Sequence, residues 1–146
     1  MSSLPIPRNI GEDDYKLFCF SDASANAYSA AVYLYSTAGG TANVNLVFSK
    51  ARVAPTKHLS IPRLELLAVI IGASALSYVA NQLQAPVTDC IVWTDSKCVL
   101  HLMKRHKPLP TFVQRRLKEI PPNKDNKTYV MKIGRASCRE RVYVLV

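Results

Sequence analysis

The sequence has few acidic residues and no paired cysteine motif. Its 146 residues include ten Asp and Glu against nineteen Lys and Arg, which gives a formal net charge of +9. Such a balance is typical of proteins that bind a polyanion, although many basic proteins have no such partner. The four cysteines form no C-x-x-C pair and no zinc-ligand series, so we expect reduced thiols in an intracellular protein.

The sequence also lacks the pattern of a secretory signal or a membrane span. Residues 1–14 contain no apolar run behind a basic start. The longest apolar stretch, LLAVIIGASALSYVA, contains two serines and a glycine, so we expect a buried helix and no membrane partner. No internal repeat is visible, and a hydrophobic content of 49% suffices for the core of one domain.

The order of apolar runs and turn residues predicts a mixed α/β domain. Gly39-Gly40 is the only glycine cluster and predicts a turn between two strands, within an antiparallel meander of three. Pro62 suits the first turn of the long helix. In chain order, the predicted elements are strands at 15–21, 28–36 and 43–49, a helix from about 62 to 83, a strand at 90–94, helices at 96–105 and 111–120, and a strand near 127–130.

Three acidic residues stand at the ends of these predicted elements. Asp22 follows the first strand, Glu65 lies near the start of the long helix, and Asp95 follows the strand at 90–94. Hydrolysis of phosphodiesters by two divalent cations, about 4 Å apart, requires several carboxylates from different parts of the fold. We therefore interpret the three acids as candidate metal ligands and catalytic residues.

Each of the three acids also has a purely structural explanation. Asp22 could end its strand in an Asx-turn, and Asp95 could cap the helix that begins at Ser96. Glu65 could be a first-turn acid that the helix dipole favours. The coincidence of three acids, rather than any one of them, supports the metal site.

Side-chain periodicity predicts that the three acids lie on core-facing sides. A carboxylate on an apolar helix face needs a cation or hydrogen bonds to offset its desolvation. Glu65 falls in line with the apolar positions Gly72, Leu76, Val79 and Leu83. Large apolar residues share the strand faces of the other two acids, Phe18 and Phe20 for Asp22, Ile91 and Trp93 for Asp95. We therefore expect Asp22 and Asp95 to lie beside the long helix.

Five blocks occur in a fixed order along the chain: SDASANAYSAAVYLY, SKARVAP, IPRLELLAVIIGA, VWTDSKCVL and FVQRRLKEI. In this order they resemble the ribonuclease H domain of Pao/BEL-type retrotransposon polyproteins. The resemblance implies a ribonuclease H-like fold, with a mixed five-stranded sheet, packed helices, and the fourth strand parallel to the first. It also implies metal-dependent hydrolysis of the RNA strand of RNA–DNA hybrids during reverse transcription, in a cytoplasmic retroelement particle.

The resemblance also implies the roles of the three acids. In that family, the Asp of the first strand, the Glu of the first helix and the Asp of the fourth strand hold the metal ions. These positions match Asp22, Glu65 and Asp95, and the expected cation is Mg²⁺ or Mn²⁺.

The same resemblance divides the chain into a domain and a tail. Residues 1–131 are expected to form the ribonuclease H-like domain, with residues 1–14 as a linker from an upstream reverse transcriptase region. The family has a fourth acidic or histidine ligand after the fifth strand, whereas residues 132–146 contain Glu140 as their only acid. Because IGRASCRERV resembles translated sequencing-adapter DNA, we expect a non-native tail and an incomplete two-metal site. The alternative is a natural basic tail.

Basic residues near the three acids predict contacts with the phosphates of a hybrid. Each group of them could equally be a solvated face. The aromatic rings of Tyr33, Tyr35 and Trp93 are expected to pack on the sheet rather than on bases. The basic groups are Lys50, Arg52, Lys57 and His58 before the long helix, Lys97 after Asp95, and Lys104, Arg105, His106 and Lys107 after the next helix.

Two other functions remain open at this point. A non-catalytic polyprotein fragment that binds nucleic acid would have the same charge. An aspartic peptidase, a label that this retroelement family also carries, needs paired Asp-Thr-Gly or Asp-Ser-Gly loops so that two aspartates share a proton. Here Asp22 occurs in DAS and Asp95 in DSK, without the glycine.

Overall fold

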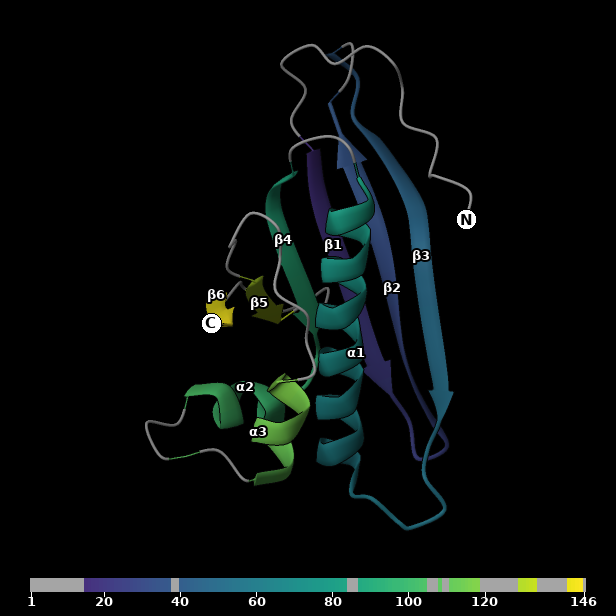
Figure 1. Cartoon of the computed structure of the whole chain (residues 1–146), viewed down its shortest axis with the longest axis vertical. Helices are drawn as coiled ribbons and strands as arrows, with labels where there is room; N and C mark the ends of the chain where they lie inside the picture. The colour runs from purple at the N-terminus through teal and green to yellow at the C-terminus, as the bar shows by residue number, and fades with distance from the viewer. Residues whose placement is uncertain are drawn as a thin grey trace.

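The structure, a computed structural model, describes residues 15–37, 40–83, 87–104, 108, 111–118, 129–133 and 142–145. Strands and helices follow one another within these ranges in the order that the sequence predicts, apart from one additional strand at residues 142–145 (Figure 1). The elements are β1 (Tyr15–Ala23), β2 (Ala27–Ser36), β3 (Asn43–Val53), α1 (Ile61–Gln82), β4 (Val87–Thr94), α2 (Lys97–Lys104), α3 (Thr111–Lys118), β5 (Tyr129–Ile133) and β6 (Val142–Leu145).

The described strands form one mixed sheet in the order β3-β2-β1-β4-β5-β6. β1, β2 and β3 form an antiparallel meander, and β4 runs parallel to β1, which confirms the predicted arrangement. β5 is parallel to β4, and β6 is antiparallel to β5. The described sheet thus has six strands rather than the predicted five. The extra strand lies in the expected tail, because the free edge of β5 can pair with any extended segment.

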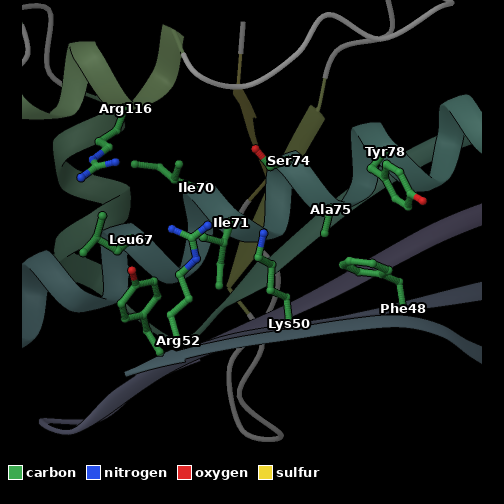
Figure 2. Close-up of a pocket in the computed structure, with 11 residues that line it drawn as sticks. Phe48, Lys50, Arg52, Leu67, Ile70, Ile71, Ser74, Ala75, Tyr78 and Arg116 are labelled. Atoms are coloured by element: carbon green, nitrogen blue, oxygen red, sulfur yellow. The ribbon is translucent and has the colours of Figure 1, made fainter. Parts of the chain in front are cut away.

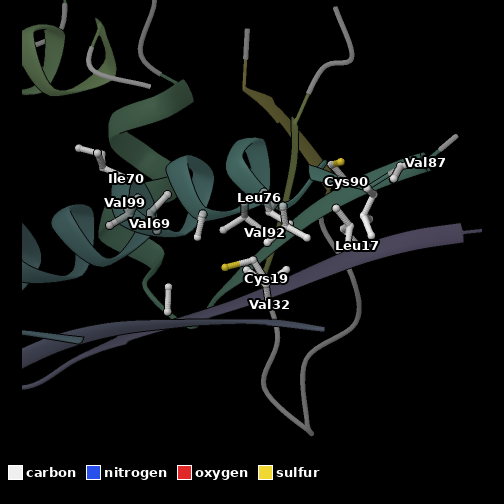
Figure 3. Packing of buried hydrophobic residues seen from close by; sticks show 14 of the residues in the cluster. Leu17, Cys19, Val32, Val69, Ile70, Leu76, Val87, Cys90, Val92 and Val99 are labelled. Atoms are coloured by element: carbon white, nitrogen blue, oxygen red, sulfur yellow. The ribbon is translucent and has the colours of Figure 1, made fainter. Parts of the chain in front are cut away.

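α1 covers one face of this sheet and supplies half of the core (Figure 1). Alternate residues of β1 and β4, such as Leu17 and Val92, point toward α1 and are fully buried against Leu76 and Val79 (Figure 3). Gly72 lets the helix lie close to β1, because a Cβ atom there would be 2.9 Å from the Cys19 Sγ. This close approach places the start of α1 near the carboxyl ends of β1 and β4.

The opposite face of the sheet carries an aromatic layer, and here one prediction was wrong. Phe18, Phe20 and Trp93 alternate with the buried positions of their strands, so they lie on the face away from α1. The expectation that the strand faces of these rings place Asp22 and Asp95 beside the long helix was therefore wrong. The Phe20 ring stacks on Trp93 at 6.3 Å between centroids and meets Tyr33 edge-on at 5.7 Å. Phe18 meets Tyr35 edge-on in the same way. The expected sheet-surface packing of Tyr33, Tyr35 and Trp93 is therefore confirmed.

The long helix and the predicted turn match expectation, whereas β3 is longer than predicted. Pro62 lies in the first turn of α1, and Gly40 has a φ of 77°, a left-handed value that favours glycine. Gly39 lies outside the described residues. β3 continues to Val53 because β2 offers backbone partners as far as Ala27, so Lys50 lies in a strand and not in the connection.

α1 is long and apolar enough to cross a membrane, by length and composition alone. However, 67% of its most apolar 18-residue window is buried inside the molecule. The helix that the sequence predicts as buried is therefore the core helix of the domain.

Candidate active site

Asp22 and Asp95 lie side by side at the carboxyl edge of β1 and β4. The two strands are parallel, and their register pairs Ser21 with Thr94. The residue that follows each of these two is one of the aspartates. Together with Phe20 and Trp93, these residues line a hollow of about 210 Å³, which we call the carboxylate hollow. Tertiary structure thus brings together two carboxylates that lie 73 positions apart in the sequence.

The Asp22 side chain is exposed, and part of its hydrogen bonding is local. Its Oδ1 accepts a hydrogen bond of 2.8 Å from the amide of the next residue, Ala23, whereas an Asx-turn bonds the amide two residues on, so this contact is not the Asx-turn considered for Asp22. Beside it, the buried Ser21 hydroxyl donates to the Trp93 carbonyl at 3.1 Å and ties β1 to β4. The strand ends that carry the two aspartates are therefore held in register.

Asp95 is not the residue that caps α2. Ser96 does so instead, because its Oγ accepts a hydrogen bond of 3.3 Å from the Val99 amide, the third residue of the helix. The Ser96 amide in turn donates to the Thr94 Oγ1 at 3.2 Å. Asp95 is thereby left half-buried at the rim of the carboxylate hollow.

Glu65 is the fifth residue of α1 and lies beyond its first turn, in which no acidic residue occurs. The helix-dipole explanation therefore does not apply to it. The Glu65 side chain is half-buried, and its Oε2 accepts a hydrogen bond from the Ser96 hydroxyl. Glu65 thus reaches the residue that directly follows Asp95.

The three carboxylates do not form one metal-binding cluster. Among the described residues, no group of three His, Cys, Asp or Glu side chains is placed to hold a metal ion. The oxygen donors of Asp22, Asp95 and Glu65 suit a hard divalent cation, but Glu65 is engaged with Ser96.

The predicted basic contacts fall into three places. Lys97, the first residue of α2, is exposed two positions after Asp95, and Lys57 is exposed between β3 and α1 next to His58. Lys50 and Arg52 lie on β3 rather than in the connection that was predicted. Of the last basic group, the Lys104 side chain and residues 105–107 lie outside the described part of the chain.

Sequence reasoning missed Ser21, Thr94 and Ser96, whose buried hydroxyls organise this edge. A signal for Ser96 is present, because serine directly before the first helical residue is a common helix cap. Ser21 has no comparable signal, since its role depends on the neighbouring strand β4.

One comparison with known proteins decides the family. The family model described as "Pao retrotransposon-like RNaseH-like domain" matches residues 1–96. The chain belongs to this family. The matched part of this Pao domain includes Asp22, Glu65 and Asp95 and ends at Ser96. Its mixed sheet, with β4 parallel to β1 and helix α1 between them in sequence, is ribonuclease H-like.

Two solved structures are similar to this Pao domain. The first, LC11-RNase H1 in complex with an RNA/DNA hybrid, shares 14% identity over 84% of this chain and 86% of that chain, with a TM-score of 0.45. The second, the Aquifex aeolicus PPX-GPPA enzyme, shares 8% identity over 73% of this chain, with a TM-score of 0.33. The Pao domain spans 34% of that second chain. No curated protein matches the sequence.

Proposed function

We propose that this Pao-family domain hydrolyses the RNA strand of RNA–DNA hybrids during reverse transcription. The observation that carries the proposal is the pairing of Asp22 and Asp95 at one hollow, across adjacent parallel strands of a ribonuclease H-like domain. Two carboxylates at a sheet edge can bind a divalent cation and present it to a phosphodiester in solvent.

The three acidic residues would each have a role in holding the divalent cation. Asp22 and Asp95 would hold Mg²⁺ or Mn²⁺, and Glu65 would join them by exchanging its bond from Ser96 for the cation. A bound cation would supply an activated water and would stabilise the charge on the phosphate. The oxygen of this water would bond to phosphorus as the bond from phosphorus to the sugar oxygen breaks. The carboxylates would keep the attacking water oriented.

The exposed cations near this edge would hold the substrate by its phosphates. Lys97 lies next to the carboxylate hollow in sequence, and Lys57 precedes the start of α1. Phosphate contacts of this type fix the position of a nucleic acid without reading its sequence, and their affinity falls with salt. Lys104, Arg105 and Lys107 are proposed to extend the same basic surface.

We also propose that residues 132–146 do not complete the metal site and that cleavage by the 146-residue chain is slow. The segment contains no Asp, and Glu140 is its only acid. Loss of a group that positions a metal ion reduces activity by about 10- to 100-fold. Within the polyprotein, an upstream reverse transcriptase region would supply the hybrid, in the cytoplasmic particle of the retroelement.

The test is cleavage of an end-labelled RNA–DNA hybrid with enzyme in excess, in Mg²⁺ and in Mn²⁺. Asp22→Asn and Asp95→Asn should abolish the residual cleavage and weaken Mn²⁺ binding measured by electron paramagnetic resonance. Asp89→Asn is the matched control, because Asp89 is an exposed acid toward the other end of β4, 3.5 Å from Lys16. Cleavage and Mn²⁺ binding that respond equally to all three substitutions would contradict the proposal.

A non-catalytic domain that binds nucleic acid is the second candidate. It is favoured by one observation, the absence of a three-carboxylate cluster among the described residues. Under this alternative, Asp22→Asn would leave hybrid binding unchanged, and no metal-dependent cleavage would occur in any variant. Measurement of hybrid binding and hybrid cleavage on the same preparations separates the two functions.

A further inference from the structure

A second concave site lies between β3 and α1, away from the carboxylate hollow. This β3–α1 groove has a volume of about 470 Å³, within the roughly 300–1,000 Å³ of small-molecule sites. At about 100° per residue, its lining residue Ser74 lies about 180° around α1 from Glu65. The groove is therefore separate from the proposed active site, on the opposite side of the same helix.

Three cations from two different elements line this groove. Lys50 and Arg52 rise from β3 toward α1, and Arg116 of α3 lies across the groove from them (Figure 2). No Asp or Glu among the described residues lines the groove. The Arg116 guanidinium also lies over the Phe112 ring, 5.7 Å from its centroid. Cations that gather at one concave surface attract an anion. The charge of the groove thus calls for an anionic ligand.

One end of the groove is aromatic. The Phe48 ring lies 5.5 Å from that of Tyr78, between centroids, with the rings tilted by 49° (Figure 2). Tyr78 is 42% exposed, so part of its ring is open to a ligand in the groove. Between the cations and these rings the wall is apolar, formed by residues such as Ile71. A ligand that joins an anionic group to a planar ring fits this combination.

The other aromatic surface of the domain lacks the same charge. On the open face of the sheet, the described cation Lys16 pairs with Asp89 at 3.5 Å. The rings there pack on one another, as in the stacked pair of Phe20 and Trp93, although Phe20 is 50% exposed. The β3–α1 groove, in contrast, combines exposed aromatic area with several cations and, among the described residues, no lining acid.

We propose that the β3–α1 groove binds a single strand of nucleic acid, with phosphates at Lys50, Arg52 and Arg116 and a base against Phe48 and Tyr78. Cationic grooves with aromatic rings are how proteins hold single strands without sequence preference. A volume of about 470 Å³ admits a segment of one strand. The site requires no divalent cation and goes beyond the proposed cleavage activity.

The test is the fluorescence anisotropy of labelled oligo-dT with the full chain in EDTA, so that neither metal binding nor cleavage contributes. Arg116→Gln and the double variant Lys50→Gln/Arg52→Gln should weaken binding severalfold. Each lost phosphate contact should lower the slope of log affinity against log salt by about 0.7. Arg115→Gln is the matched control, because Arg115 is exposed on the same helix and does not line the groove. Equal losses of oligo-dT affinity for Arg115→Gln and Arg116→Gln would overturn the proposal that this groove is the binding site.

Two further probes identify the ligand. Tyr78→Ala should weaken oligo-dT by about fivefold or more, because stacking of a base is lost, and should not affect an abasic oligonucleotide of equal length. Polyglutamate should compete poorly with oligo-dT. Effective competition by polyglutamate, or an equal effect of Tyr78→Ala on both oligonucleotides, would overturn the assignment to nucleic acid. Circular dichroism of each variant verifies that it is folded.

Discussion

The Ser96 hydroxyl donates a hydrogen bond to the Glu65 carboxylate, and the same oxygen accepts one from the Val99 amide. One buried side chain thus caps α2 and restrains the acid that α1 contributes to the candidate site. This pair joins two helices that begin at the same edge of the sheet, next to Asp95. The position of the Glu65 side chain therefore depends on Ser96, the residue that caps α2.

Replacement of Ser96 tests this relationship. Ser96→Ala should lower the free energy of unfolding by about 1 to 2 kcal/mol, because α2 loses its cap and Glu65 loses a buried donor. Ser96→Thr keeps a hydroxyl and should lower the free energy of unfolding much less. The measurement is urea denaturation followed by circular dichroism. Equal stability of Ser96→Ala and the unchanged chain would show that the two hydrogen bonds contribute nothing in solution.

The contact of Gly72 with Cys19 leads to a second prediction. Gly72→Ala should destabilise the domain, although alanine is the better helix former by about 1 kcal/mol. The new Cβ would lie 2.9 Å from the Cys19 Sγ and 3.5 Å from the Ala30 Cβ, and overpacking of a core typically costs about 1–3 kcal/mol.

The partner variant makes this prediction specific. In the double variant Gly72→Ala/Cys19→Ala the Sγ atom is absent, so Gly72→Ala should be less harmful there than in the unchanged chain. The unfolding free energies of the unchanged chain, the two single variants and the double variant form a double-mutant cycle. The double variant should be more stable than the sum of the two single effects predicts. A coupling near zero would mean that the helix and β1 adjust without strain.

The thiols of Cys19 and Cys98 should differ sharply in reactivity. Burial raises the pKa of the Cys19 thiol to about 12, against a smaller lowering by a hydrogen bond with the Ala31 backbone, so almost no thiolate is present near pH 8. Cys98 is exposed on α2. Iodoacetamide at pH 8 should label Cys98 in the folded protein and Cys19 only after denaturation, as peptide mass spectrometry can measure. Rapid labelling of Cys19 without denaturant would contradict the packing of α1 on β1.

The same pKa predicts a loss of stability in alkali. In the unfolded chain the Cys19 thiol ionises near its ordinary pKa of 9.0, whereas in the folded protein its pKa is about 12. Below pH 9 both states keep the proton, and between pH 9 and 12 only the unfolded state releases it, so stability falls there by up to about 1.4 kcal/mol per pH unit. Cys19→Val should show a shallower decline in urea denaturation between pH 8.5 and 10.5. Identical slopes would argue against a strongly raised pKa.

Deletion of the last strand tests the nature of the tail. β6 is four residues long and pairs only with β5 among the described strands, at the edge of the sheet. Removal of residues 134–146 should therefore change the melting temperature by less than about 4 °C. Removal of residues 129–146, which also takes away β5, should lower the melting temperature much more. A large loss from the shorter deletion would identify the tail as a native part of the domain.

The element order was predictable because local patterns decide it. Aromatic and apolar residues with β propensity identified β1, the runs on either side of Gly39-Gly40 identified β2 and β3, and Pro62 with a long apolar run identified α1. The boundaries were less predictable where a neighbouring strand decides them. β3 extends through Arg52 because β2 offers backbone partners, and the sequence of β3 does not contain that information.

The face on which a strand residue lies was the main error of the sequence reading. Phe18 and Phe20 are large and apolar, and were therefore placed toward α1. The structure buries Leu17 and Cys19 there instead, and Gly72 of α1 lies so close to β1 that a Cβ atom there would be 2.9 Å from the Cys19 Sγ. Periodicity shows which residues share a face, but not which face the helix covers.

The sequence by itself determined the order of strands and helices, the basic charge, and the three acids at the ends of elements, since each depends on local residue type and spacing. Only the tertiary structure decided that Asp22 and Asp95 share one hollow while Glu65 bonds to Ser96. It alone placed Lys50, Arg52 and Arg116 around a single groove. The physical reason is that such sites form between segments distant in sequence, whose distances are set by strand register and by the packing of α1 on the sheet.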